Sequence, residues 1–326
     1  MAFLTDDQIR HFDEYGYLLV EEVLDAATDL DPTIEEYHRV LDNLAQMLYE
    51  QGEIASRYED LPFSERLVQI YRESNQVHAQ YFDFSLPKGA VALDTPMWVG
   101  PAVFHLMRHE GLLDIVESLI GPEIYSNPVQ HVRLKPPERL TPINPKTGRV
   151  QLGATPWHQD NGVVLPEADE TDMITVWFPL WDAPIESGCL QIVPGSHRDG
   201  LQVHCPAPIG TSLTNQYVQA QQEEVLPVPM KRGDILLLHR HTAHSSLSNL
   251  SDSIRWSFDL RYNPIGQPTG RDAFPGFVAR SRKNPESELR DPEAWAALWY
   301  EARRNLAART EPAILDRWSA DNPSCA

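Results

Sequence analysis

The stretch Thr155-Pro156-Trp157-His158-Gln159-Asp160-Asn161 lies within the part of the chain whose pattern decides the fold. Between residues 126 and 263, short apolar runs alternate with proline, glycine and aspartate. Short runs at this spacing are typical of an antiparallel β-sandwich or β-barrel. The strands that we expect are Val129–Leu134, Met173–Leu180, Leu190–Val193, Val225–Pro227, Asp234–Leu238 and Arg255–Tyr262.

Helical patterns flank this β-rich segment on both sides. Thr5 and Gln8 have the spacing of a capping box, and apolar residues recur at helical spacing through much of residues 1–120. Asp291 and Pro292 predict the start of a final helix that runs to Arg309. We therefore expect one domain over residues 1–326. Its expected parts are mostly helical support (1–125), a β core (126–263), and a C-terminal loop and helix (264–326).

The composition excludes several classes of protein. The 326 residues include 27 Lys+Arg and 47 Asp+Glu, which gives a net charge of −20. Nucleic acids and anionic membrane surfaces attract basic proteins, so neither is expected as a partner. The 27 prolines argue against a helical bundle, and no apolar stretch approaches the ~20 residues of a membrane span.

The cysteines predict a reducing environment. Cys189, Cys205 and Cys325 are widely spaced and form no Cys-x-x-Cys pair. This number and spacing predict neither a thiolate zinc site nor a disulfide framework. The first residues lack the basic and apolar regions of a secretion signal. We therefore expect a cytoplasmic protein.

His158 and Asp160 are the first candidates for a metal site. Residues two apart on a strand project from the same face, so this imidazole and this carboxylate would point the same way. Two histidines and one carboxylate form the facial triad that holds non-haem Fe(II) and leaves coordination positions open. A second segment, residues 233–246, supplies three more histidines after an apolar run: His239, His241 and His244.

These segments occur with further motifs in the order of one known family. The chain resembles the phytanoyl-CoA dioxygenase (PhyH-like) family of Fe(II)/2-oxoglutarate oxygenases. The most specific spacing is the eleven residues from His244 to Arg255. The matching motifs are Phe12-Asp13-Glu14-Tyr15-Gly16-Tyr17, Leu119-Ile120-Gly121-Pro122, Lys135-Pro136-Pro137, His158-Gln159-Asp160, Trp177, Gly188-Cys189-Leu190-Gln191-Ile192-Val193-Pro194-Gly195-Ser196-His197, and Gly233-Asp234 leading to His239, His244, Ser246, Asn249, Ser251 and Arg255.

The resemblance implies a fold and a set of metal ligands. The implied fold is α+β with a mainly β core, a double-stranded β-helix (jelly roll, cupin-like) with N-terminal and C-terminal helices packed around it. The implied ligands, which are also the catalytic residues, are His158, Asp160 and His244. If His241 were the distal ligand instead, the spacing to Arg255 would lose its match.

The resemblance also implies four residues beside the cosubstrate 2-oxoglutarate. Arg255 matches the residue that pairs with its distal carboxylate, because a guanidinium fork suits a carboxylate. Ser246 matches a hydroxyl that supports the same carboxylate, and Trp177 matches a tryptophan that lines the pocket. Anchoring the preceding strand on Lys135-Pro136-Pro137 places His131 at a cofactor-facing position.

Three residues are candidates for binding the substrate. Strand parity turns Arg133 the same way as His131, and Arg261 the same way as Arg255. Both arginines are candidates to hold an anionic group, with a surface salt bridge as the alternative for Arg261. Trp98 is the third candidate. Residues 97–99, 210–224 and 271–283 are the segments expected to face the substrate.

The implied activity is hydroxylation of a small-molecule metabolite with Fe(II), 2-oxoglutarate and O2, giving succinate and CO2. A carboxylate at Asp160 favours oxygenation over halogenation, because related halogenases carry a small residue there. Desaturation, epoxidation or cyclisation on the same scaffold are alternatives. More remote alternatives are a cupin-like metal hydrolase or isomerase and a non-catalytic metal sensor. Family members are monomers or homodimers.

Overall fold

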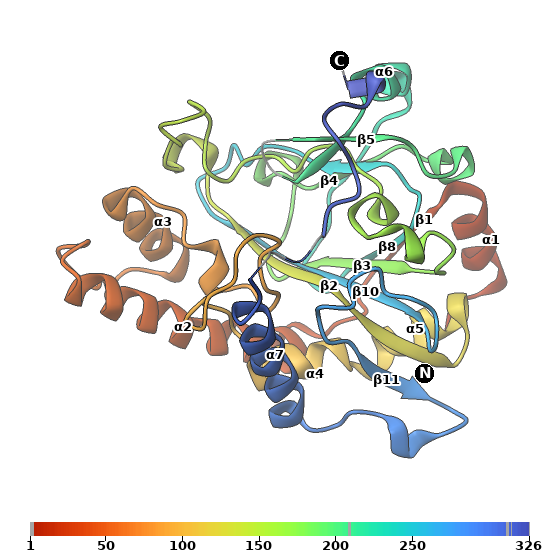
Figure 1. Cartoon of the computed structure of the whole chain (residues 1–326), viewed down its shortest axis with the longest axis horizontal. Helices are drawn as coiled ribbons and strands as arrows, with labels where there is room; N and C mark the ends of the chain where they lie inside the picture. Colours follow the sequence, from red (N-terminus) through yellow and green to blue (C-terminus); the bar gives the residue numbers. More distant parts are fainter. Residues whose placement is uncertain (1–2, 208–209, 311–312, 314, 326) are drawn as a thin grey trace.

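The computed structural model describes residues 3–207, 210–310, 313 and 315–325. Its larger sheet has six antiparallel strands in the order β1-β8-β3-β10-β2-β11, and the long strands β2 and β10 lie side by side (Figure 1). From one edge of the sheet to the other, the strands are β1 (Tyr17–Val20), β8 (Ile235–His239), β3 (Ile174–Pro179), β10 (Arg255–Pro264), β2 (Glu123–Lys135) and β11 (Phe277–Ser281).

A smaller sheet packs against the larger one and completes a jelly roll. An apolar cluster fills the space between the two sheets, with Trp177 and Leu236 on the larger sheet and Leu190 and Val228 on the smaller one. The strands of the smaller sheet, in order, are β7 (Leu226–Val228), β4 (Leu190–Ile192) and β9 (His244–Ser246). A separate hairpin pairs β5 (His204–Pro206) with β6 (Thr211–Leu213).

Strand β10 shows how the sequence pattern produces two faces. Its even-numbered residues from Trp256 to Tyr262 are aromatic or aliphatic and belong to the main apolar core. Its odd-numbered residues from Arg255 to Arg261 are polar or charged, and they too are buried. Because side chains alternate along a strand, the apolar face packs under the helices and the polar face lines the interior of the jelly roll.

Helices cover the outer face of the larger sheet, below it in the view of Figure 1. Tyr37 on one of them packs edge-to-face on Trp256, with ring centroids 5.2 Å apart, and Phe63 stacks on the same indole at 4.8 Å. The helices on this side are α2 (Asp31–Glu50), α3 (Phe63–Ser74), α4 (Pro101–Met107), α5 (Glu110–Ile120) and α7 (Pro292–Ala307). Helix α1 (Asp6–Tyr15) lies beside the edge strand β1, and α6 (Asn215–Ala220) follows β6.

Several expectations about this architecture are confirmed. The fold is the expected α+β jelly roll with a mainly β core. The capping box of α1 is formed, since Thr5 accepts from the backbone of Gln8 and the Gln8 side chain accepts from the backbone of Thr5. Asp291 caps α7, with Pro292 in its first turn. The long segment 210–224 holds two short elements that were not expected, β6 and α6.

The expectation that His158 and Asp160 lie on one strand is wrong. His158 forms only an isolated bridge with His244, and Asp160 begins a 3-10 turn that runs to Val163. Pro156 and Gly162 flank this segment, and neither residue favours a regular ladder at that point. The two side chains therefore converge through a turn rather than through strand alternation.

The expectation of reduced, unpaired cysteines is also contradicted. Cys205 and Cys325 form a disulfide between residues 120 apart in sequence, while Cys189 is a buried free thiol. The disulfide joins β5 to the C-terminal tail, so the local spacing of the cysteines could not predict it. Among the described residues, no helix is both long and apolar enough to cross a membrane.

Candidate metal centre

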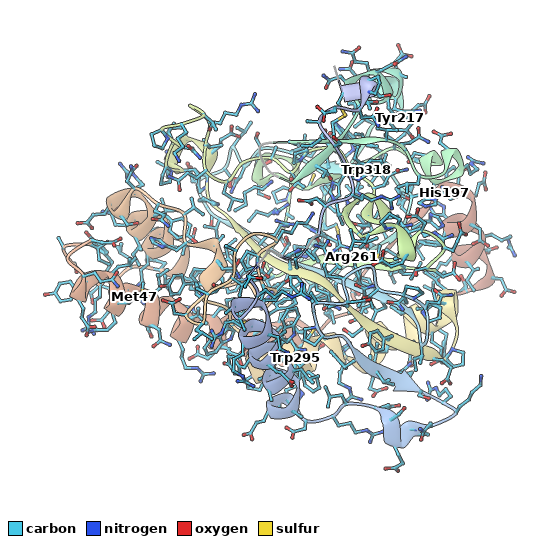
Figure 2. All side chains as sticks on the ribbon, viewed as in Figure 1. Met47, His197, Tyr217, Arg261, Trp295 and Trp318 are labelled. Carbon is cyan, nitrogen blue, oxygen red and sulfur yellow. A yellow bond between two sulfur atoms is a disulfide. The ribbon has the colours of Figure 1, made fainter. Side chains whose placement is uncertain are left out.

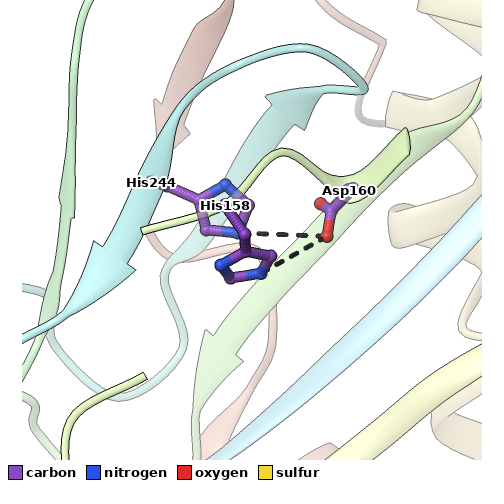
Figure 3. Close-up of side chains that lie close together, drawn as sticks. All are labelled: His158, Asp160 and His244. Carbon is purple, nitrogen blue, oxygen red and sulfur yellow. Dashed lines mark ion pairs between the residues drawn. The ribbon is translucent and has the colours of Figure 1, made fainter. Parts of the chain in front are cut away.

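Three side chains converge at the rim of the jelly roll (Figure 3). One candidate ligand atom from each of His158, Asp160 and His244 lies within 4.8 Å of the others. The Nε2 atoms of His158 and His244 lie 3.8 and 3.9 Å from Oδ1 of Asp160. Paired backbone hydrogen bonds of 2.9 and 3.0 Å between His158 and His244 fix the spacing of the two imidazoles. His241, the alternative distal ligand, lies outside this group.

Each imidazole is oriented by a second contact. Nδ1 of His158 lies 2.8 Å from the carbonyl of Pro156, and Nδ1 of His244 lies 3.0 Å from the carbonyl of Thr242. A carbonyl accepts only, so Nδ1 is the donor in each ring, and Nε2 keeps its lone pair for a metal. Burial, followed by the charge of His244, holds the pKa of His158 well below its ordinary value, so this ring is neutral.

Asp160 is held as a carboxylate by two donors. Arg261 donates to Oδ1 and Thr175 donates to Oδ2. Burial alone would raise the pKa of Asp160, but Arg261 and the two histidines outweigh it and hold the pKa below its ordinary value. A divalent metal needs a deprotonated carboxylate and neutral imidazoles, and this group supplies both. The donor set therefore fits Fe(II).

A buried basic cluster, formed by Arg255 and Lys135 with Ser246, lies next to these three residues in the fold. Ser246 is two residues after His244 on β9, and its Oγ accepts from Lys135 Nζ at 2.6 Å and from the backbone of Thr155 at 2.8 Å. Arg255 and Lys135 are register partners on β10 and β2. No carboxylate of the described residues lies within ion-pair distance of either cation. We call this group the inner cluster.

The inner cluster is electrostatically incomplete. Burial, followed by repulsion from Arg255, lowers the pKa of Lys135 well below its ordinary value, and burial lowers the pKa of Arg255 to about 10. The guanidinium of Arg255 lies over the ring of Trp177 at 5.5 Å and donates to the carbonyl of Gly188 at 3.0 Å. Two buried cations without a counter-ion favour the binding of an anion between them. In the sequence, Lys135 was identified as part of the Lys135-Pro136-Pro137 motif, and its role here was missed.

A cavity of about 220 Å³ opens beside His158. His131 and Arg133 line it, as do residues from several loops. Nδ1 of His131 lies 2.8 Å from the Asp83 carboxylate, which the sequence did not identify as a partner. Arg133 faces Asp259 with a nitrogen-to-oxygen distance of 4.0 Å. Both residues therefore line the cavity, and their roles toward the cosubstrate and the substrate stay predictions.

The two other substrate candidates have different surroundings from those expected. Arg261, near the middle of the molecule in Figure 2, also lines the cavity, but it donates to Asp160 and to the carbonyl of Val129. Trp98 is not among the described residues that line the cavity. Its indole donates to the buried carboxylate of Glu36 at 2.8 Å, because that carboxylate needs donors in the helical layer.

A jelly roll with two histidines and one carboxylate at its rim defines the class of non-haem iron enzymes. The phytanoyl-CoA dioxygenase (PhyH) family model matches residues 12–257, and the chain belongs to that family. It is a 2-oxoglutarate-dependent non-haem iron dioxygenase, and the cofactors of this family are iron, 2-oxoglutarate and O2.

Two curated relatives are similar to the chain in sequence, and one solved structure shares its fold. The chain is 26% identical over 278 residues to a zebrafish (Danio rerio) phytanoyl-CoA dioxygenase domain-containing protein 1, covering 78% of this chain and 88% of that protein. It is 28% identical over 182 residues to a 1-deoxypentalenic acid 11-beta-hydroxylase of Streptomyces arenae, covering 52% and 59%. The non-heme monooxygenase ThoJ shares the fold, with a TM-score of 0.59 and 18% identity over 92% of this chain and 97% of that one.

Proposed function

We propose that this protein hydroxylates a small-molecule metabolite and couples this reaction to the conversion of 2-oxoglutarate to succinate and CO2. One substrate C–H bond becomes C–OH, one oxygen atom of O2 enters the product and the other enters succinate. The observation that carries the proposal is the inner cluster. Its two buried cations, Arg255 and Lys135, lack a counter-ion among the described residues, and Lys135 donates to Ser246, two residues after the candidate ligand His244.

Each of these residues has a separate role in the proposal. His158, Asp160 and His244 would hold the iron, which together with 2-oxoglutarate and O2 supplies the oxidising power for the C–H bond. Arg255 and Lys135 bind the distal carboxylate of 2-oxoglutarate, and the cation–π contact with Trp177 keeps the guanidinium in place.

Asp160 favours oxygenation among the possible outcomes. Its carboxylate is fixed by the donors Thr175 and Arg261, so it occupies the position that a halide would need. A cavity of about 220 Å³ fits a small metabolite, and part of its wall is apolar: Val129, Val163 and Phe274. Analysis of the product distinguishes hydroxylation from desaturation, epoxidation and cyclisation.

Anaerobic titration of the Fe(II)-loaded protein with 2-oxoglutarate tests the proposal. Chelation of the iron gives a weak visible charge-transfer band in the wild type. The Arg255→Ala variant should need about a hundredfold more 2-oxoglutarate, because it loses a charge-assisted pair and leaves an unpaired carboxylate. Arg139→Ala is the matched control, since Arg139 is exposed and pairs with Asp252 on the surface.

The absence of a band in protein shown to contain stoichiometric iron would overturn the proposal. The same titration in Arg139→Ala should match the wild type. Equal titration curves for wild type and Arg255→Ala would remove Arg255 from the cosubstrate site while leaving the iron site intact.

The location and assembly of the protein are separate proposals. We infer a cytoplasmic monomer or homodimer. The bridge between Cys205 and Cys325 supports an oxidised form of the chain, although disulfides are rare in that compartment. Alkylation before lysis, followed by mass measurement of the intact chain, counts the free thiols, and light scattering gives the oligomeric state.

A further inference from the structure

One arginine in the cavity has no role in the site described so far. Arg271 follows β10 in the chain and lines the cavity together with His158. Its side chain is 2% exposed. Nη2 donates to the carbonyl of Val163, but Nε and Nη1 have no partner among the described residues. A buried guanidinium usually has its donors satisfied, so this cation lacks a ligand.

The charges around Arg271 leave it without a direct counter-ion. Burial lowers its pKa to about 10, while Asp316 and Glu167 partly oppose this effect and Arg261 adds to it. None of the described carboxylates lies within ion-pair distance of Arg271. Asp316 is bound instead to Lys88, with 2.9 Å between Oδ1 and Nζ. Lys88 lines the same cavity.

Part of the wall of this cavity is apolar. Val129, Val163 and Phe274 line the cavity, and the guanidinium lies over the Phe274 ring at 5.9 Å. Thr211 adds a buried hydroxyl without a partner among the described residues. The cavity thus combines a cationic end, an apolar wall and the imidazole of His158.

We propose that the substrate of this enzyme is a small monocarboxylic acid whose carboxylate binds Arg271, while its apolar body presents a C–H bond beside His158. This inference rests on the proposed hydroxylase function and names the substrate class of the same site. Arg271 is a specificity-determining residue in this arrangement, because a ligand without an acid group leaves the guanidinium buried and unpaired.

The charge balance favours a monoanion. Lys88 pairs with Asp316 and Arg261 with Asp160, while Arg133 and His131 of the same cavity face Asp259 and Asp83. Arg271 is therefore a buried cation of this cavity that lacks a direct partner among the described residues. One carboxylate restores neutrality there, whereas a phosphate dianion would bring one negative charge too many. The inference therefore commits to a carboxylate rather than to a phosphate ester or a CoA thioester.

Calorimetric titration of the anaerobic Fe(II)–2-oxoglutarate protein tests the inference without turnover. The probes are linear monocarboxylates from butanoate to decanoate, the primary amide of each, and octyl phosphate. The best acid should bind wild type about ten- to a hundredfold more tightly than its amide, the range expected for a charge-assisted hydrogen bond. Octyl phosphate should bind more weakly than octanoate.

Variants at position 271 assign the preference to this residue. Arg271→Gln should lose the preference for acid over amide, and Arg271→Lys should keep part of it because the charge remains. Arg139→Gln, on the surface, should behave like wild type. Thermal unfolding checks that each variant is folded. If Arg271→Gln does not fold, the comparison of acid with amide in wild type, together with Arg271→Lys, decides the question.

The outcomes separate this inference from the proposed function. Equal affinity for acids and amides in wild type, an unchanged acid preference in Arg271→Gln, or tighter binding of octyl phosphate would overturn it, even if the iron–2-oxoglutarate band forms normally. A missing band would overturn the proposed function, and the calorimetric preference would still be readable in the same sample. Arg271→Gln should retain the band, because Arg271 does not belong to the inner cluster.

Discussion

Two basic regions, one buried and one partly exposed, lie near the candidate metal centre, and they are built in different ways. The inner cluster comes from strands β2, β9 and β10, where sheet register places Arg255 opposite Lys135. The outer cluster comprises Lys88, Arg271 and Asp316, which come from two loops and the C-terminal tail. The inner cluster is positioned by the main sheet, whereas the outer one depends on how separate loops meet. This difference suits a shared cosubstrate on one side and a variable substrate on the other.

The two regions also differ in charge balance. The inner cluster has two cations and no direct counter-ion among the described carboxylates, whereas the outer cluster has two cations and one bound carboxylate. The expected ligands follow from these balances. The distal carboxylate of 2-oxoglutarate binds the more positive inner cluster, and a monocarboxylate binds the outer one. Four variants test this difference between the two regions.

The largest effect is expected where both regions depend on the same metal. Asp160→Asn should weaken iron binding by more than about a hundredfold. Even the loss of a residue that only hydrogen-bonds to a metal ligand lowers metal affinity about ten- to a hundredfold. The variant also leaves Arg261 with a neutral amide in place of its buried counter-ion. Iron content after equilibrium dialysis measures the effect. Asp252→Asn, which removes an exposed carboxylate, is the control. Wild-type iron content in Asp160→Asn would contradict the assignment.

Lys135→Met should separate the inner cluster from the outer one. Because the pKa of Lys135 is lowered, its ammonium group loses a proton in the free protein as pH rises. The negative charge of bound 2-oxoglutarate favours the protonated ammonium form. The affinity of wild type for 2-oxoglutarate should therefore fall as pH rises through the lowered pKa, by up to about tenfold per pH unit. Lys135→Met should bind 2-oxoglutarate about tenfold more weakly than wild type at low pH. Its affinity should not show the fall with rising pH that comes from deprotonation of Lys135.

Band titrations across a pH series provide this measurement. Acid binding at Arg271 should be the same in Lys135→Met and wild type when both are saturated with 2-oxoglutarate. A pH dependence that is identical in the two proteins would mean that Lys135 does not titrate with the cosubstrate.

A smaller effect is expected from Lys88→Met in the outer cluster. Lys88 is already neutralised by Asp316, so its removal frees a carboxylate that can compete for Arg271. The acid preference should fall several-fold, less than in Arg271→Gln. The double variant Lys88→Met with Asp316→Asn should recover most of the preference. Failure of this recovery would show that Lys88 contacts the substrate itself.

The smallest effect on either cluster is expected from Cys325→Ser. The bridge to Cys205 anchors the tail that carries Asp316 and Trp318, and the Trp318 indole donates to the carbonyl of Gly162. Loss of a cross-link over 120 residues should lower the free energy of unfolding by about 2–4 kcal/mol. The affinity for 2-oxoglutarate should change less than twofold. Denaturant unfolding with and without a thiol reductant measures the stability, and the reductant should have no further effect on the variant.

The sequence predicted the fold well where a simple period governs it. The alternation along the strand predicted that Arg255 and Arg261 face the same way, and the structure places the first guanidinium over Trp177 and the second against Asp160. The order of the motifs predicted the group His158, Asp160 and His244, and the structure brings their candidate ligand atoms together. Their assignment as iron ligands stays a prediction that the Asp160→Asn experiment tests.

Sequence reasoning failed where a partner comes from a distant, aperiodic segment. Arg261 was a substrate candidate, but its guanidinium contacts Asp160, because the 3-10 turn at residues 160–163 aims that carboxylate at β10. Trp98 was also a substrate candidate, but the buried Glu36 binds its indole. No spacing in the sequence links either pair.

The β core, the helical layers and the residues that face the interior of the sheet follow from local sequence patterns. The reason is physical, since side-chain direction repeats every two residues on a strand and every 3.6 residues on a helix. Three features are visible only in the tertiary structure. They are the loops that meet at the cavity, the pairing of Cys205 with Cys325, and the position of the unpaired Arg271 in the same cavity as Lys88. Such contacts depend on how chain segments far apart in sequence close against each other, and no local pattern encodes that closure.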